Sequence, residues 1–211
     1  MSSIKLKHSG GSAVSLNPPT SAPTSSEVAF KLPNAYGSAN QLLKTDGSGN
    51  LGWATDKGIT QADQWRVTAN FDTANANMIT TNWERNDTRF SVLGSGMSES
   101  SGTFTFPETG IYKIEFTAKG TSSNQQVRYI VAEIITSSNN FSSEGSSAYA
   151  SQSMSNDASA DATANTSCIF DVTDVTTHKC RFTVYSEHSI TWTGSSTTNA
   201  TYATFIRLGD T

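Results

Sequence analysis

Apolar and polar positions alternate most clearly in the stretch TFTFPETGIYKIEFTAKG, residues 103–120. Two phenylalanines precede Pro107, a Glu-Thr-Gly turn follows, and the alternation then resumes. In the second run Tyr112, Ile114 and Phe116 would point to one face, with lysine, glutamate and threonine on the other. Aromatic and β-branched residues at period two, bounded by proline and glycine, are typical of strands. The pattern predicts two strands joined by a tight turn, the second half-buried against the core.

Shorter runs of the same kind recur through the rest of the chain after residue 60. Strand-like runs lie at Trp65–Phe71, Phe90–Leu93, Val127–Ile135, Thr166–Val172, Cys180–Tyr185 and Tyr202–Leu208. Turn residues separate these runs, and no helical period of useful length lies between them. Many strands without crossover helices predict an antiparallel sandwich. A jelly roll satisfies this number of strands.

In the first sixty residues, apolar and polar positions alternate only in short runs with few apolar residues each. Residues 4–7 and 13–16 flank a Ser-Gly-Gly-Ser break, which predicts a β-hairpin. Residues 18–26 are rich in Pro, Ser and Thr, which is typical of an extended linker. A Gly-rich turn, Asp46–Asn50, follows Leu42-Leu43 and precedes another short run. Its residues alternate as calcium ligands do, but the distal acidic ligand of an EF-hand-type loop is missing, so a hairpin turn is favoured.

We therefore expect an all-β protein with two parts, an N-terminal arm (residues 1–60) and a sandwich head (residues 61–211). The arm cannot bury much apolar surface alone, because a lone hairpin is marginal in water. Sister chains or a larger assembly must cover it. The apolar residues expected in that docking contact are Ile4, Leu6, Val14, Leu16, Val28, Phe30 and Leu32.

Composition and charge narrow the classes of protein. Charged residues are only 15% of the 211 residues and hydrophobic ones 35%, a balance that favours short strands over helices. The net charge of −4 argues against general nucleic-acid binding. The arm has five lysines against three acids and the remainder nine bases against fifteen acids, an asymmetry that hints at different surroundings for the two parts. No apolar run approaches the roughly 20 residues of a membrane span, and the N-terminus lacks the apolar core of a secretory signal.

The chain has two cysteines, Cys168 and Cys180. A hairpin centred near Asp174 would place them opposite each other on neighbouring strands, both facing the apolar side. Buried free thiols are favoured over a disulfide because no export signal is present. A metal site is disfavoured because no third or fourth soft ligand is nearby.

No catalytic constellation is recognisable. The histidines, His8, His178 and His188, do not have metal-ligand spacing. A nucleophile elbow, a Walker loop and a dinucleotide-binding glycine motif are all missing. The acidic pairs Glu84–Asp87 and Asp157–Asp161 lie in apparent loops, where solvated charges are favoured over glycosidase carboxylates. We expect a protein that is not an enzyme and has no cofactor or metal, with calcium at the second pair as the weaker alternative.

The stretch Ser137–Thr166 is unusually rich in Ser, Asn and Ala. One interpretation is a long solvated loop pair around a short strand. The other is an outer contact surface, because Ser, Asn and Tyr are adaptable hydrogen-bonding partners. Phe141, Tyr149 and Met154 would anchor such a surface. Weak polar sites of this kind suit saccharides.

A central strand motif and a terminal strand motif occur in a fixed order in the head. The pattern FxxPxxGxYxFxF is matched by Phe104, Pro107, Gly110, Tyr112 and Phe116, and the terminal aromatic-x-x-Leu pattern by Phe205 and Leu208. These motifs resemble the complement-1q/tumour-necrosis-factor superfamily over about residues 64–211. Members of that family are ten-stranded jelly rolls that form tight homotrimers, so the resemblance implies a homotrimeric, complement-1q-like head. Aromatic candidates for core or trimer contacts are Tyr112, Phe116, Tyr129, Tyr202 and Phe205.

The arm pattern SIKLKHSGGSAVSLNPPTSAP…VAFKLPNAYGSANQLLKTDGSGNLGWAT spans residues 3–55. It is similar to N-terminal segments of tail-fibre-like and other virion structural proteins of tailed bacteriophages. The resemblance implies attachment of the arm to a virion assembled in the host cytoplasm. We expect a trimeric appendage, a tail fibre or capsid fibre, with other virion proteins and a host-surface glycan as candidate partners. A capsid decoration protein without receptor binding and a glycan-degrading enzyme are the alternatives.

Overall fold

The computed structural model describes residues 4–17, 19–23, 27–55, 58–87, 91–123, 126–143, 145–155 and 159–211. The chain divides into two compact units between Lys57 and Gly58, close to the predicted boundary of arm and head. The described residues form strands, turns and irregular segments. Within them, no helix is long and apolar enough to cross a bilayer.

The arm contains two hairpins, both predicted from the sequence. Their strands are β1 (Ile4–Lys7) with β2 (Ala13–Leu16), and β3 (Gln41–Thr45) with β4 (Leu51–Thr55), each pair antiparallel. Residues 28–32, where the alternation is strand-like, form only an isolated parallel bridge from Lys31 to Asn50. The backbone N–H of Lys31 donates to Gly49 O at 2.8 Å, so this segment lies along the second hairpin.

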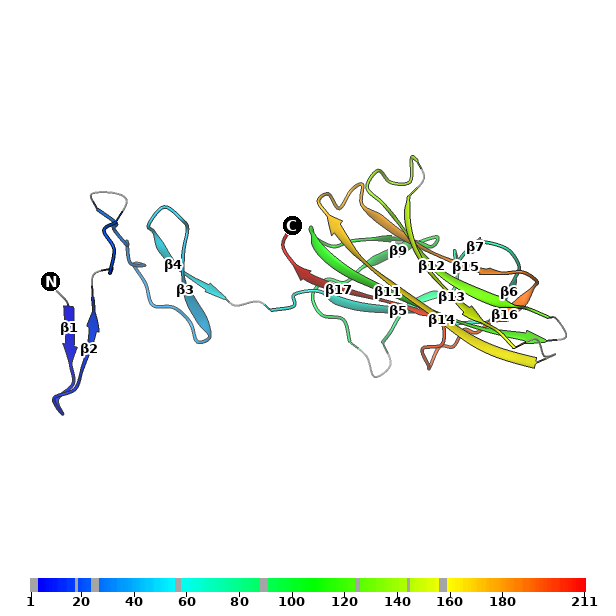
Figure 1. The fold of residues 1–211 in the computed structure, drawn as a ribbon, viewed down its shortest axis with the longest axis horizontal. Helices are drawn as coiled ribbons and strands as arrows, with labels where there is room; N and C mark the ends of the chain where they lie inside the picture. The colour runs from blue at the N-terminus through cyan, green and yellow to red at the C-terminus, as the bar shows by residue number, and fades with distance from the viewer. Residues whose placement is uncertain are drawn as a thin grey trace. The chain divides into compact units, whose positions relative to one another are not determined.

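The head is a sandwich of two antiparallel sheets (Figure 1). The first, named here the β12 sheet, consists of β13 (Ser146–Ser153), β12 (Tyr129–Ser137), β15 (Lys179–Ser186), β10 (Thr103–Thr105) and β9 (Ser98–Ser100), with β7 (Asn77–Met78) paired to β15. The second, the β11 sheet, contains β14 (Ser159–Val172), β11 (Gly110–Ser123), β17 (Tyr202–Gly209), β5 (Ala62–Val67) and β8 (Trp83–Arg85), with β16 (Ile190–Trp192) and β6 (Phe71–Thr73) beyond the end of β17. The chain passes repeatedly from one sheet to the other, as in a jelly roll.

The predicted hairpin at residues 103–120 is wrong in its pairing. Strand β10 pairs with β9 and β15, whereas β11 pairs with β14, β16 and β17. The turn at residues 106–109 carries the chain across the sandwich instead of back along one sheet. Both strands still direct their apolar side chains into the same core, so their alternation is the same for either topology.

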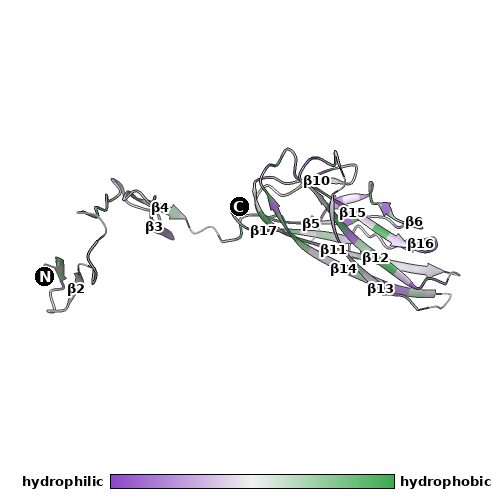
Figure 2. Cartoon of the chain, turned by 45° about the horizontal axis from the view of Figure 1, so that its top comes forward, coloured by the Kyte–Doolittle hydropathy of each residue, from purple (hydrophilic) through white to green (hydrophobic). Residues whose placement is uncertain are grey.

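The core is aromatic at its centre. Tyr112, Ile114 and Phe116 of β11 are fully buried, as predicted. Phe104 of β10 contacts rings on both sheets: its centroid lies 5.5 Å from Trp65, 5.2 Å from Trp83, 5.2 Å from Phe182 and 5.3 Å from Phe205. Most of these pairs are edge-to-face, the arrangement that adds energy beyond buried area. Figure 2 shows hydrophobic, green segments on strands of the head.

Most of the Ser/Asn/Ala-rich stretch forms strands and not the predicted loop pair. It contains β13 and the first half of β14, which pairs with β11 along its whole length. Ala160, Ala162 and Ala164 point into the core, and the residues between them are exposed. Another predicted strand, Phe90–Leu93, begins outside the described residues, and Leu93 forms only an isolated bridge with Ala62.

The two cysteines are not on paired strands. Cys168 lies on β14 of one sheet and Cys180 on β15 of the other, because the intervening turn crosses the sandwich. Both are free thiols, Cys180 fully buried and Cys168 half-buried. Burial raises the pKa of each thiol. The favoured interpretation was two buried free thiols: both thiols are free, but only Cys180 is fully buried, and the predicted pairing of their strands is wrong.

Candidate functional site

The arm exposes nearly every apolar side chain that was predicted to dock. Ile4, Leu6 and Leu16 are each 65% exposed, and Val28, Phe30 and Leu32 are exposed to a similar degree. Val14 lies on β2 opposite Leu6, but its side chain lies outside the described ones. Among the described side chains of the arm, none is buried. The described side chains of the arm therefore provide apolar surface and form no core.

The second hairpin is held by a tryptophan and by an aspartate in its turn. Trp53 Nε1 donates to Ala35 O at 2.9 Å, and its ring lies so close to Gly37 that a Cβ there would be 2.6 Å from it. A shallow hollow of about 340 Å³ lies along β3–β4 beside this ring. In the Asp46–Asn50 turn, Asp46 accepts from Asn50 Nδ2 at 2.5 Å and from Ser48 N at 2.8 Å, and these bonds lower its pKa. The Asp46 carboxylate therefore accepts hydrogen bonds from its own turn, in agreement with the hairpin turn favoured from the sequence.

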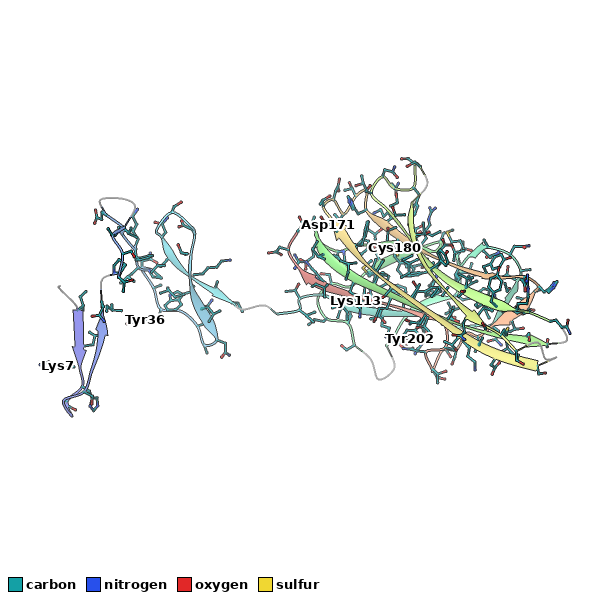
Figure 3. All side chains as sticks on the ribbon, viewed as in Figure 1. Lys7, Tyr36, Lys113, Asp171, Cys180 and Tyr202 are labelled. Carbon is teal, nitrogen blue, oxygen red and sulfur yellow. The ribbon has the colours of Figure 1, made fainter. Side chains whose placement is uncertain are left out.

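The predicted core or trimer aromatics separate into two groups. Tyr112, Phe116 and Phe205 are buried within the chain and belong to its own core. Tyr129 and Tyr202 are half-buried. The ring of Tyr129 stacks on Tyr185 with centroids 5.8 Å apart on the outer face of the β12 sheet. Tyr202 lies on the outer face of the β11 sheet, where Figure 3 labels it together with Lys113.

The outer face of the β11 sheet carries an apolar row that the sequence interpretation did not single out. Ile169, Lys113 and Ile206 lie side by side on β14, β11 and β17. Ile169 is 61% exposed, and Leu208, two residues beyond Ile206, is 50% exposed. Lys113 is paired with Glu115, Nζ to Oε1, at 2.7 Å. The signal was present in the sequence, because alternation along β14 puts Ile169 outside when Phe170 is inside.

The predicted outer contact residues have three different environments. Tyr149, on β13, is 69% exposed. Phe141 is half-buried, and the Arg181 guanidinium carbon lies 3.8 Å from its ring centroid. Met154 is buried in the core, so its role as an outer contact is wrong. Its backbone N–H donates to Arg128 O at 2.9 Å, one residue beyond the end of the β12–β13 pairing.

The acidic pairs and histidines form no catalytic arrangement in the described part of the chain. Glu84 and Asp87 both bind the buried Arg66, Nε to Glu84 Oε2 at 3.0 Å and Nη2 to Asp87 Oδ1 at 3.4 Å. Asp161 accepts from Thr121 Oγ1 at 2.5 Å and lies 3.6 Å from Lys119 Nζ, contacts that lower its pKa.

Asp157, the other half of the predicted calcium pair, lies outside the described residues. His178 is buried against Phe170 and hydrogen-bonds to the turn around Asp174. His8 accepts from Gly10 N in the first hairpin, and His188 O accepts from Ser186 Oγ. Among described residues, no three His, Cys, Asp or Glu side chains gather as metal ligands do.

Comparison with known proteins shows the fold. No protein-family model and no curated protein sequence matches the chain. The chain is similar to a crystal structure of murine APRIL at pH 8.5, with a TM-score of 0.50 and 9% identity over 70% of this chain and 98% of that one. A structure of murine APRIL at pH 8.0 gives a TM-score of 0.48 and 10% identity over the same shares. The head is therefore an antiparallel jelly roll of the kind found in tumour-necrosis-factor-like proteins, as the sequence predicted.

Proposed function

We propose that this chain is a non-enzymatic structural protein of a tailed-phage particle, a homotrimeric appendage attached by its arm and projecting its jelly-roll head. The observation that carries the proposal is the arm's exposed apolar surface. Full burial of one Ile or Leu side chain is worth about 1.5–3 kcal/mol. Ile4, Leu6 and Leu16, each 65% exposed, would gain that stabilisation by burial against a neighbouring molecule.

Self-association of the head is supported by the outer face of the β11 sheet. Its row of Ile169, Lys113 and Ile206, extended by Leu208, is apolar except for a charge that is already paired with Glu115. In a closed ring of three copies each interface joins two different patches, so this row would be buried in every copy against another surface of its neighbour. The resemblance of the head to a family of trimers supports the number three.

Attachment to a virion is supported by the similarity of residues 3–55 to N-terminal segments of phage virion proteins. A tail fibre, a capsid fibre and a decoration protein share this arrangement of arm and head. Immunogold labelling of purified particles with an antibody against the head distinguishes them by location. Particles without label would refute the virion role, and release of reducing ends from host envelope polysaccharide would refute the non-enzymatic one.

Sedimentation velocity of the full-length chain tests the assembly. The expected species has three times the chain mass of 22.5 kDa. Ile169→Asp combined with Leu208→Asp is expected to weaken the trimer, because two charges would be buried at the contact. Tyr149→Asp, at an exposed position on the other sheet, serves as the control. A wild-type chain that sediments as a compact single subunit would refute the proposal.

A further inference from the structure

We propose that the second half of the arm, residues 27–55, packs against the same segment of two other copies, so that sister chains cover its apolar face. This inference rests on the proposed function, because it needs copies that the head already holds together. It names what covers this part of the arm and leaves the first hairpin, residues 4–16, for attachment. Residues 27–55 are described without a gap, so both faces of the segment can be assigned in full.

Three stretches of this segment lie side by side as a small sheet, with β4 in the middle (Figure 1). On one side β4 pairs antiparallel with β3. On the other side Lys31 forms a parallel bridge with Asn50: Lys31 N donates to Gly49 O and Leu51 N donates to Lys31 O, both at 2.8 Å. Paired residues share a face of a sheet, and successive residues alternate between its faces. The register therefore decides which face each side chain belongs to.

One face of this sheet, named here the leucine face, is uncharged. Leu43 lies opposite Trp53 across the hairpin, and Leu51 is on the same side two residues before Trp53. The two neighbours of Lys31 point the other way from it and so belong to this face as well. Leu51 is half-buried, and the other apolar members are exposed: Phe30 by 64%, Leu32 by 76%, Leu43 by 48% and Trp53 by 42%.

The opposite face carries the charges. Lys31 and Lys44 belong to it, on the two strands that flank β4. Copies packed through this face would bring four or more lysines of like charge together, whereas copies packed through the leucine face leave them in solvent. A second copy is therefore compatible with the leucine face and not with the lysine-bearing one. The other members of the lysine-bearing face are Leu42, Asn50, Gly52 and Ala54.

The area of the leucine face decides between a sister chain and a separate partner. Its exposed rings and leucines together offer apolar area of roughly 200–400 Å². A stable interface between free proteins buries about 800 Å² on each partner. The face is thus too small to capture a protein from solution, but sufficient between tethered chains, for which the second contact is intramolecular. The tether is short, because β4 ends at Thr55 and the head begins with β5 at Ala62.

The ring at the centre of the leucine face is already fixed. Trp53 Nε1 donates to Ala35 O at 2.9 Å, and the ring lies against Gly37. A side chain held in this way loses little freedom when another surface packs on it. Around a three-fold axis, each copy would turn its leucine face toward the axis and its lysines outward. The three sheets would then enclose the core that one arm lacks.

Hydrogen exchange of the full-length protein, read by mass spectrometry of peptides from residues 41–55, tests the contact. Leu43→Asp and Leu42→Asp are a matched pair, because these neighbouring exposed leucines lie on opposite faces of the sheet. In the trimer, Leu43→Asp should accelerate exchange of β3 and β4 about tenfold, since burial against the other copies is lost. Leu42→Asp should stay within about twofold of wild type. The proposal is overturned if the two substitutions have equal effects or if neither has any.

The same substitutions in the Ile169→Asp/Leu208→Asp chain separate contact between copies from contact within one chain. Leu43 faces Trp53 in its own hairpin, so its loss would loosen that hairpin even without a neighbour. In this chain, which we expect to be monomeric, β3 and β4 should exchange faster than in the trimer and respond to Leu43→Asp by less than about twofold. An equal response in monomer and trimer would assign Leu43 to its own hairpin and overturn the proposal. Peptides from β11 are the internal reference and should not respond to either arm substitution.

Sedimentation of the same samples distinguishes this proposal from the proposed function. The expected result is a Leu43→Asp chain that remains a trimer through its head while its β3–β4 hairpin exchanges faster. A wild-type trimer in which Leu43→Asp behaves as Leu42→Asp does refutes the leucine-face contact alone. A wild-type chain that sediments as a single subunit refutes the trimeric appendage and this contact with it.

Discussion

Replacing Asp63 with asparagine is expected to destabilise the head by about 3–5 kcal/mol, the usual cost of breaking a buried ion pair. Asp63 lies on β5, the first strand of the head, and is only 5% exposed. Both of its oxygens accept from Arg85 Nε at 3.1 Å. Its Oδ2 also accepts from Trp65 Nε1 at 2.9 Å and from Met97 N at 2.7 Å, and its Oδ1 accepts from Gln64 N at 2.9 Å.

The magnitude follows from these donors. An asparagine amide has one accepting oxygen, so its NH₂ group must face N–H donors on one side. If it faces Trp65 and Met97, two donors lose their acceptor, each at about 1–3 kcal/mol. Arg85 is partly exposed and can be rehydrated, so its share of the cost is smaller than for a fully buried partner.

Urea unfolding followed by near-ultraviolet circular dichroism measures the effect. In a separate thermal melt, the melting temperature of a domain of this size should fall by about 6–20 °C, at roughly 2–4 °C per kcal/mol. Asp72→Asn is the matched control, because Asp72 is exposed and accepts from Thr191 Oγ1 at 2.7 Å. The reasoning is refuted if Asp63→Asn stays within about 1 kcal/mol of wild type, or if the control costs as much.

Three further outcomes are expected. Phe104→Ala should cost about 3–5 kcal/mol in urea unfolding, because it empties the centre of the aromatic core, and a cost below about 1.5 kcal/mol would contradict that packing. Iodoacetamide followed by mass spectrometry should label Cys168 slowly and Cys180 only after unfolding. Burial raises the pKa of both thiols, so labelling should keep accelerating above the ordinary pKa of 9.0, and rapid double labelling at neutral pH would contradict it. Desolvation raises the pKa of Tyr112 to about 12 from 10.0, so its neutral form contributes stability that is complete below pH 10.0 and lost as the pH rises to about 12. Tyr112→Phe should remove that part of the alkaline loss, as measured by melting temperature against pH.

The fold was predictable where the buried side chains are large. Each of β11, β12, β15 and β17 directs at least one aromatic or branched residue inward, so alternation shows clearly in the sequence. In the first half of β14 the inward residues are Ala160, Ala162 and Ala164, and alanine and serine have little strand preference. Burial against the rest of the sandwich forms this strand, and only the faint period of the alanines indicated it.

Strand partners were less predictable than strands. Alternation at period two identifies the buried face but not the neighbour, so β10–β11 and the strands of Cys168 and Cys180 were wrongly paired. The polar cavity beside the β12–β13 turn shows the same limit. Its Ser/Asn-rich turn indicated polar contacts, but Phe170 reaches it from the other sheet and could not be assigned from spacing.

The position of β17 has a consequence for synthesis on the ribosome. This strand lies between β11 and β5, and Gln64 of β5 donates to Thr204 of β17 across a separation of 140 residues. At about 5–20 residues per second, β5 waits roughly 7–28 s after it is translated before its partner exists. During that interval the edge of β5 that will pair with β17 has unpaired backbone N–H and C=O groups, which can pair with other chains. The yield of folded protein should therefore depend on holdase chaperones and on translation speed through the second half of the message.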